Sequence, residues 1–291
     1  MSDSKLSINW FPGHMQKSFR ELESSLKIID AVICVLDARA PYSCINRSLE
    51  NIISGKEIIY VLNKCDMANP EINKEWKKFF EGKGKICEII DATKSSCKNV
   101  IFKAINKATN TKQEKQKSRG VLGKIRIAIV GVPNTGKSTL LNTLGGAYLS
   151  KTGNLAGITR SSSWIKIKNG IELMDNAGTL APKISDPKVA KNLAFIGSIN
   201  DNVLSICELA EELVKKLILI APQQLENRYK LNCEKNASQI LTEIGKIRGY
   251  VVKGGEVDLE RTSSAIIDDF RKGRIGKISL ESPKDYTTNE R

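Results

Sequence analysis

The sequence contains little of what metal, disulfide or membrane chemistry requires. It has one histidine and seven cysteines, an odd number never spaced C-x-x-C, which argues against both a zinc site and a disulfide framework. No apolar run reaches the ~18 residues of a membrane span, and no apolar targeting segment stands near the N-terminus. We therefore expect no membrane contact and, by default, a cytoplasmic location.

Acidic residues are also scarce relative to basic ones. The 32 aspartates and glutamates face 46 lysines and arginines, which gives a net charge of +14. An excess of this size favours attraction to polyanions, nucleic acid first among them, although a solvated lysine-rich surface without such a partner explains the same number. The 291 residues, 41% of them hydrophobic, allow two domains with buried cores.

Short apolar runs separated by helix-length segments predict an α/β fold with a mostly parallel sheet. The expected strands are residues 31–36, 57–62, 86–90, 125–130 and 171–174, with a more polar edge strand within 161–169. The basic segment from Lys103 to Lys124 is expected to be a solvated linker inside this domain.

The pattern becomes helical near residue 186. Asp186-Pro187 is typical of an N-cap followed by proline at the first helical position, and apolar residues then recur at helical spacing. We predict one domain over residues 1–185 and an all-helical C-terminal domain over residues 186–291.

A phosphate-binding loop follows the strand at 125–130. Residues 131–138 (GVPNTGKS) fit the P-loop pattern G-x-x-x-x-G-K-[ST] and lead into a helix-compatible segment. Backbone N–H groups of such a loop wrap a β-phosphate, while Lys137 bridges the β- and γ-phosphates and the Ser138 hydroxyl coordinates Mg²⁺. The predicted nucleotide contacts are Gly131, Val132, Pro133, Asn134, Thr135, Gly136, Lys137, Ser138 and Thr139.

A guanine-reading motif follows the strand at 57–62. Asn63-Lys64-Cys65-Asp66 fits N-K-x-D, in which one carboxylate accepts both the N1–H and the 2-amino group of guanine. Adenine offers no such donor pair, so Asp66 is the predicted base selector, and Asn63 and Lys64 are expected to brace the P-loop and lie along the base. Asp91, Ala92 and Thr93 stand where a loop supporting the base is expected.

Residues 175–178 (DNAG) follow another apolar strand and fit D-x-x-G. In this pattern Asp175 holds Mg²⁺ through water and the Gly178 N–H meets the γ-phosphate. Thr159 is expected to complete the Mg²⁺ coordination when a γ-phosphate is present. Thr152 is the alternative, and Thr159 is preferred because a strand follows it directly. The predicted metal-site residues are Ser138, Thr159 and Asp175, and the predicted catalytic residues include Lys137 and Thr159.

The motif order is rotated relative to an ordinary GTPase, in which the P-loop comes first. Here the base-reading motif starts at residue 63, the support loop at 91, the P-loop at 131 and D-x-x-G at 175. The same sheet forms if the basic segment joins the positions where an ordinary GTPase has its N- and C-termini, and if the new termini lie between D-x-x-G and the strand at residue 31. This rearrangement is a circular permutation. The segment after Gly178 then leads directly into the helical domain.

With these motifs, residues 10–15 (WFPGHM), 37–41 (DARAP) and 254–261 (GGEVDLER), the chain resembles the circularly permuted ribosome biogenesis GTPase A, or YlqF-type, family. The resemblance implies a P-loop GTPase that uses Mg²⁺, binds GTP and GDP, and acts late in large ribosomal subunit assembly. It also implies that the helical domain helps to bind rRNA. We expect a monomer that hydrolyses GTP slowly alone and faster on the ribosomal subunit.

Two more residues are candidates for the hydrolysis step. Asn134 resembles the K⁺-liganding asparagine of some ribosome-associated and tRNA-modifying GTPases, and a turn asparagine is the alternative. After permutation, residues 1–27 take the place of the switch helix that follows D-x-x-G. Because the family's corresponding histidine is implicated in hydrolysis, we expect His14 to orient the attacking water, against the alternative of a histidine satisfied within its own turn.

The D-x-x-G segment departs from the family pattern. Asn176-Ala177 stands where the family usually has Thr-Pro, and Thr179 stands where the family usually has a large apolar residue. No water-orienting side chain therefore follows the motif.

Two other functions fit less well. Permuted GTPases that act on the small subunit have an added OB domain or a zinc-binding segment. This chain has neither the length for the first nor the cysteines for the second. A nucleotide-gated RNA-binding protein would need GTP only to order its switch.

Overall fold

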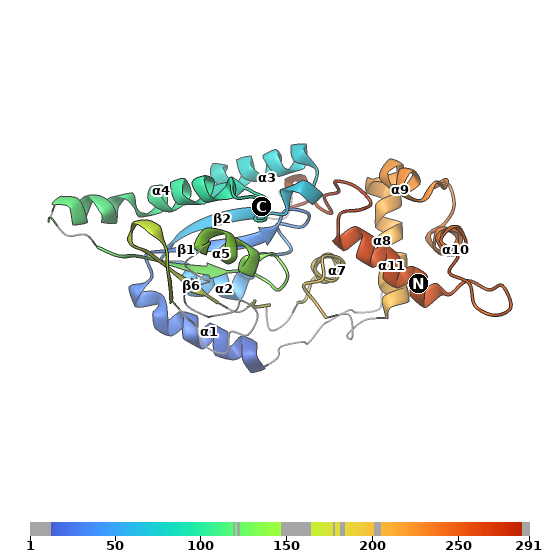
Figure 1. Cartoon of the computed structure of the whole chain (residues 1–291), viewed down its shortest axis with the longest axis horizontal. Coiled ribbons are helices and arrows are strands. Elements are labelled where there is room, and N and C mark those ends of the chain that lie inside the picture. Colours follow the sequence, from blue (N-terminus) through green and yellow to red (C-terminus); the bar gives the residue numbers. More distant parts are fainter. Residues whose placement is uncertain are drawn as a thin grey trace.

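The chain folds into two halves arranged along its longest axis (Figure 1). The computed structural model describes residues 13–118, 120, 123–146, 164–176, 178–180, 184–200 and 205–286. One half is built around a sheet, and the other consists of helices α7 to α11, of which α7 lies next to the sheet half. The prediction of an α/β fold with a helical C-terminal portion is confirmed.

The sheet has six strands in the order β3-β2-β1-β4-β6-β5. Their bounds are Ala31–Asp37 (β1), Glu57–Asn63 (β2), Ile86–Ile89 (β3), Ile125–Val130 (β4), Trp164–Lys166 (β5) and Ile171–Asp175 (β6). β5 runs antiparallel to β6 at the edge, and the other pairs are parallel. Four of the five apolar runs therefore became central strands, the fifth became the edge strand β3, and the more polar run became the opposite edge strand β5 as expected.

Helices cover both faces of the sheet. Those on one face are α1 (Gly13–Ser25), α2 (Arg47–Ile53) and α3 (Pro70–Gly82), and those on the other are α4 (Cys97–Ser118) and α5 (Lys137–Gly145). α3 illustrates the local cause: the Asn69 side chain accepts from the first turn, Pro70 takes the first helical position, and Trp76 and Phe80 lie four residues apart in the core.

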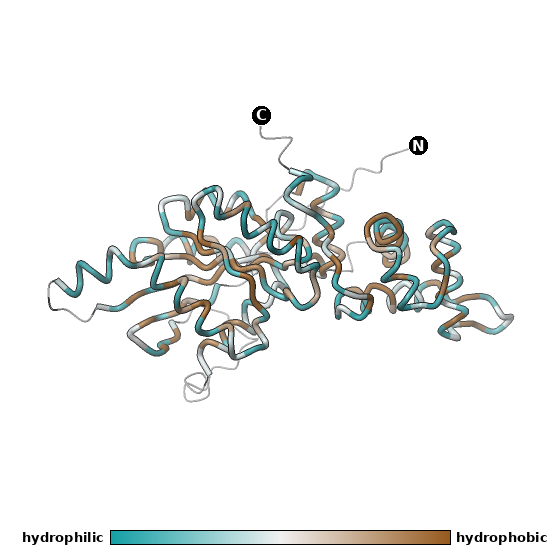
Figure 2. The backbone as a smooth tube through the Cα atoms, turned by 90° about the horizontal axis from the view of Figure 1, so that it is seen from above, coloured by the Kyte–Doolittle hydropathy of each residue, from teal (hydrophilic) through white to brown (hydrophobic). Residues whose placement is uncertain are grey.

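The segment from Lys103 to Lys124 is not the linker that its lysines suggested. α4 continues to Ser118, and Ala104 and Ile105 are buried against the sheet. The outer end of the helix projects beyond the sheet and is mostly hydrophilic (Figure 2). Lysine and glutamine have good intrinsic helix propensity, so a basic segment that starts in a packed helix continues as helix.

The helical half begins with α7 (Pro187–Phe195), whose Asp186 side chain caps the first turn ahead of Pro187 as predicted. It continues with α8 (Ile206–Ile220), α9 (Pro222–Tyr229), α10 (Ala237–Ile247) and α11 (Leu259–Arg271). The apolar stripe of α8 is buried against α10 and α11. None of the described helices has the length and apolar character needed to cross a membrane.

After α11 the chain returns to the sheet half. The Leu280 N–H donates to the Arg39 carbonyl (2.7 Å), and the Trp76 indole N–H donates to the Glu281 carbonyl (3.3 Å). The ring of Tyr286 stacks on Tyr42, with the centroids 3.7 Å apart. The helical half is therefore attached to the sheet half at both of its ends.

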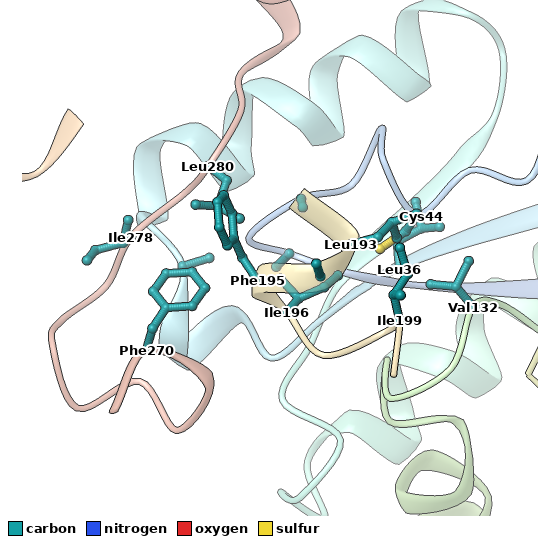
Figure 3. Packing of buried hydrophobic residues seen from close by; sticks show 14 of the residues in the cluster. Leu36, Cys44, Val132, Leu193, Phe195, Ile196, Ile199, Phe270, Ile278 and Leu280 are labelled. Carbon is teal, nitrogen blue, oxygen red and sulfur yellow. The ribbon is translucent and has the colours of Figure 1, made fainter. Parts of the chain in front are cut away.

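A continuous apolar core joins the two halves. Figure 3 shows Leu193, Phe195 and Ile196, from α7 and the residue after it, between Leu36 of β1 and Phe270 of α11. All five are buried. Because protein interiors are close-packed, a shift of α7 is felt on both sides of this core.

Candidate nucleotide-binding site

The predicted motifs meet at one edge of the sheet. Asn63 ends β2, Asp175 ends β6, the P-loop follows β4, and Asp91 lies just after β3. Because these strands are parallel, their carboxyl ends share an edge, which is where open α/β sheets bind ligands. The rotated motif order therefore preserves a single site.

The P-loop depends on two glycines with left-handed backbone. Gly131 has φ +149° and Gly136 has φ +93°. A Cβ on Gly131 would collide with the Val35 carbonyl oxygen of β1, and one on Gly136 with the Asn63 side chain. The glycines let the loop approach the neighbouring strand ends closely. Helix α5 begins at Lys137 directly after Gly136, so its free N–H groups lie at the loop, as anion binding requires.

Lys137 is enclosed by its own loop. Its ammonium is buried and donates to the Val132 carbonyl at 2.8 Å. Burial lowers the lysine pKa to about 8. Burial likewise raises the pKa of the neighbouring Asp175, against the opposing influence of the Lys137 charge. Each charge is poorly solvated here, so a phosphate would be a better partner for Lys137 than the surrounding protein.

Nucleotide binding should therefore take up protons near pH 8. Free Lys137 is about half-deprotonated there, whereas phosphates favour its charged form, so the complex binds about half a proton more than the free protein. Affinity should be greatest below this pH and fall as pH rises through 8. Calorimetry of GDP binding at pH 8, in buffers of different protonation enthalpy, measures the uptake.

Lys216 provides the control, because burial also lowers its pKa to about 8 but it lies in the helical half. Lys216→Met should keep the proton uptake of the unaltered chain. No uptake in the unaltered chain, or its loss in Lys216→Met, would contradict the role given to Lys137.

Asn63 holds three loops together. Its side-chain nitrogen donates to the Thr135 carbonyl of the P-loop (2.7 Å), and its oxygen accepts from the Ala92 N–H (2.9 Å). Ala92 is fixed further by the Thr143 hydroxyl of α5, which donates to its carbonyl (2.6 Å). Asn63 is 2% exposed, so these bonds form in the interior, where an unpaired polar group is costly. Asn63 therefore ties the P-loop to the loop that contains Ala92.

Lys64 also contacts the P-loop, with its ammonium 2.5 Å from the Asn134 carbonyl. It has φ +58°, which turns the chain into the short 3₁₀ helix Cys65–Met67. Asp66 lies in that turn with its side chain exposed, and the Asp91 carboxylate accepts from Thr93 through both its N–H (2.9 Å) and its hydroxyl (2.6 Å). The base-reading and support loops are thus ordered beside the P-loop.

The D-x-x-G segment lies directly against the P-loop. The Thr179 N–H donates to the Gly131 carbonyl (3.1 Å), and a Cβ on Gly178 would lie 2.9 Å from the Pro133 Cα. The Asn176 carboxamide and the Thr179 hydroxyl are buried, and neither has a hydrogen-bond partner among the described residues. Buried polar groups are usually paired, so this segment is less well satisfied than its neighbours.

The residues available to Mg²⁺ fit that ion. Ser138 offers an exposed hydroxyl on the first turn of α5, and Asp175 pairs in register with Ile129 of β4, next to the P-loop. Hydroxyl and carboxylate oxygens are the donors Mg²⁺ prefers, and nucleotide phosphates usually supply the rest. Thr159, Thr152 and Ala177 lie outside the described residues. Of His14, the backbone at the start of α1 is described but the side chain is not.

Two contacts between the P-loop and the helical half were not predicted. The Asn134 side-chain nitrogen donates to the Gly197 carbonyl (2.5 Å), and the Ser198 hydroxyl donates to the Pro133 carbonyl (2.7 Å). Gly197 and Ser198 follow α7. Neither residue belongs to a recognisable motif, and the sequence carried no signal for this contact.

Comparison with known proteins points to a family of GTPases. Residues 126–241 match the model of a family described as 50S ribosome-binding GTPase. Ribosome biogenesis GTPase A of Bacillus cereus is 37% identical over 96% of this chain and 95% of its own length. The protein of that name from Thermotoga maritima is 31% identical, over 96% of both chains.

Solved structures agree as well. GNP-bound YlqF from T. maritima has a TM-score of 0.66 and 27% identity, covering 92% of this chain and 99% of that one. GDP-bound YlqF has the same TM-score and identity, covering 91% of this chain and all of its own. The fold, the rotated motif order and the near full-length similarity lead to one conclusion: the chain belongs to the ribosome biogenesis GTPase A family, circularly permuted P-loop enzymes that hydrolyse GTP.

Proposed function

We propose that the GTP form of this protein binds an immature large ribosomal subunit late in its assembly, and that hydrolysis, stimulated by the subunit, releases it. The observation that carries this proposal is the direct contact of Gly197 and Ser198 with the P-loop. A change at the γ-phosphate acts on Gly178, which lies against Pro133, and Pro133 is held by Ser198. By this route the γ-phosphate would be three contacts away from the helical half.

The ribosomal partner is supported by charge and by family membership. A net charge of +14 favours rRNA, and the matching family model is described as 50S ribosome-binding. The basic residues at the end of α11 and directly after it are engaged with other groups of the protein. Lys272 and Arg274 pair with Asp268, and Arg271 donates to the Ala194 carbonyl (2.7 Å). The rRNA contact must draw on other basic residues as well.

Cosedimentation with purified ribosomal subunits tests the proposal. At near-physiological salt, we expect the protein to pellet with large subunits more strongly with a GTP analogue than with GDP. The affinity for the subunit should differ by about five- to 150-fold, the usual range of coupling between two sites. Raising salt should weaken binding, with log affinity falling by about 0.7–0.9 per neutralised phosphate for each unit of log salt. Equal pelleting with GDP and the analogue, or with small and large subunits, would leave only nonspecific attraction to RNA.

Guanine selection and metal binding are assigned to individual residues in the same proposal. Asp66 reads guanine, Asn63 and Lys64 hold the pocket, and Ser138, Thr159 and Asp175 hold Mg²⁺, the last through water. The assignment of Asp66 is supported by its exposed carboxylate. The turn that carries it is held by a hydrogen bond from the Cys65 N–H to the Ile90 carbonyl (3.2 Å).

Asn134 is proposed as a ligand of K⁺, which would neutralise charge that develops during hydrolysis. A cation takes the carboxamide oxygen, and the bond to Gly197 uses the nitrogen, so the two roles are compatible. We expect faster single-turnover hydrolysis in KCl than in NaCl at equal ionic strength. Asn134→Ala should hydrolyse GTP at the same rate in the two salts. Ser198→Ala loses the adjacent contact without losing a cation ligand and should keep the K⁺ preference. Equal rates in the two salts for the unaltered protein would count against the assignment.

A further inference from the structure

A buried ion pair lies at the end of β1, outside the nucleotide motifs. Asp37 is the last residue of β1 and is fully buried, and Arg39 is 1% exposed. The guanidinium donates through Nε to Asp37 Oδ1 (2.9 Å) and through Nη2 to Oδ2 (2.8 Å). Removing two charges from water is costly, and burial of such a pair rarely adds to stability. The pair is therefore a candidate for a role other than stability.

Asp37 has a second cation, and it belongs to the base-reading motif. The Lys64 ammonium lies 3.0 Å from Asp37 Oδ2 while it also contacts the Asn134 carbonyl of the P-loop. Burial alone would raise the pKa of Asp37, but Arg39 and Lys64 outweigh it and hold the pKa below its usual value. The carboxylate thus pairs with both Lys64 and Arg39. How strongly it pairs with each cation determines the position of the Lys64 ammonium.

Arg39 also binds the end of helix α11. Its Nη1 donates to the Phe270 carbonyl (2.9 Å) and the Arg271 carbonyl (3.2 Å), and the guanidinium carbon lies 5.1 Å from the centre of the Phe270 ring. The last carbonyls of a helix lack partners within it and carry its negative dipole end, so a cation here is favourable. Arg39 therefore connects α11 to Asp37, and Asp37 connects to Lys64 and the P-loop.

We propose that Arg39 is a positioning residue for guanine nucleotide binding, which acts through Asp37 on Lys64 and so ties nucleotide affinity to the position of the C-terminal end of α11. With Arg39 present, Asp37 is satisfied and Lys64 reaches the P-loop. Without it, the buried carboxylate has Lys64 as its neighbouring cation and draws the ammonium away from Asn134. By linkage, a partner that displaces the end of α11 changes nucleotide affinity, and the nucleotide changes the affinity for that partner by the same factor.

The test measures binding of fluorescent mant-GDP to the full-length chain, without any ribosomal component, so its outcome is independent of the proposed subunit. Arg39→Met should weaken mant-GDP by about five- to 150-fold, the range of coupling between connected sites. Arg39→Lys should have a smaller effect, because an ammonium keeps the charge but lacks the planar fork that reaches Asp37 and both carbonyls. If Arg39→Met does not fold, the same comparison is made with Arg39→Lys.

A double-mutant cycle with Lys64→Met separates positioning from general stability. If Arg39 acts through Lys64, its substitution should have little further effect on mant-GDP affinity in the Lys64→Met background, whereas independent effects would add. Glu281→Gln is the matched control. Glu281 is buried between the halves, accepts from the Ser43 N–H (3.0 Å) and the Tyr286 hydroxyl (2.8 Å), and has no bond to Asp37 among those described.

Glu281→Gln should lower Tm, because the amide N–H groups of the glutamine would face the donors that now bond to the carboxylate. The substitution should leave the affinity for mant-GDP unchanged. Additive effects of Arg39 and Lys64 substitutions would overturn the proposal. A loss of affinity in Glu281→Gln equal to that in Arg39→Met would do the same, because it would show that the integrity of the interface alone sets the affinity.

Discussion

Replacing Asp66 with asparagine should reduce the affinity for GDP by a factor of about 10⁴ and create a preference for xanthosine diphosphate. The carboxylate accepts two hydrogen bonds from guanine, and an asparagine would oppose the guanine 2-amino group with its own amide N–H. Xanthine has a carbonyl at that position, which accepts from the amide. Competition of GDP and xanthosine diphosphate for a fluorescent nucleotide measures the exchange.

Cys65→Ala is a suitable control because Cys65 occupies the variable position of the N-K-x-D motif, one residue before Asp66. That variant should retain guanine selectivity. If Asp66→Asn still preferred GDP, or if the unaltered chain bound ATP as well as GTP, the base would have to be read elsewhere.

Replacing His14 with alanine should slow single-turnover GTP hydrolysis by about 10²- to 10⁴-fold, the usual contribution of a general base. The affinity for GTP should stay unchanged, because the proposed contact is with water. α1 begins at Gly13, so residue 14 lies in the first turn of a helix that packs on the sheet through Leu22. Only neutral imidazole accepts a proton, so the rate of the unaltered protein should fall at acidic pH, where an imidazole becomes protonated.

His14→Ala should lose this pH dependence together with the rate. A variant that kept the full subunit-stimulated rate, or the same pH profile, would assign His14 to the local structure of its turn.

Local pattern was sufficient to locate the strands at whose ends the predicted nucleotide motifs lie. Apolar runs gave the strands to within one residue, and each motif begins where a run ends, because buried parallel strands must present their polar ends at one edge. The cap at Asp186-Pro187 was found for the same reason, since its chemistry lies within a few residues.

Contacts between distant segments could not be found in this way. Arg39 and Phe270 are 231 residues apart, and Asn134 and Gly197 are 63 apart, so no periodicity connects them. Charge composition misled at α4, where lysines suggested a linker although helix propensity and a buried first half produced a helix. A signal was nevertheless present at Asp37-Ala38-Arg39: charged residues directly after a fully apolar strand must be paired if they are buried.

The return of residues 278–286 to the sheet half has a consequence for synthesis. In chain topology, helices α8 to α11 are inserted into the nucleotide-binding unit, because Glu281 and Tyr286 complete a surface that Ser43 and Trp76 begin. The strands and the P-loop leave a translating ribosome first, yet the buried face of Trp76 stays uncovered until residue 286 has emerged. Folding of the nucleotide-binding unit is therefore completed last, and a chain cut after α11 would expose that aromatic face to other unfolded chains.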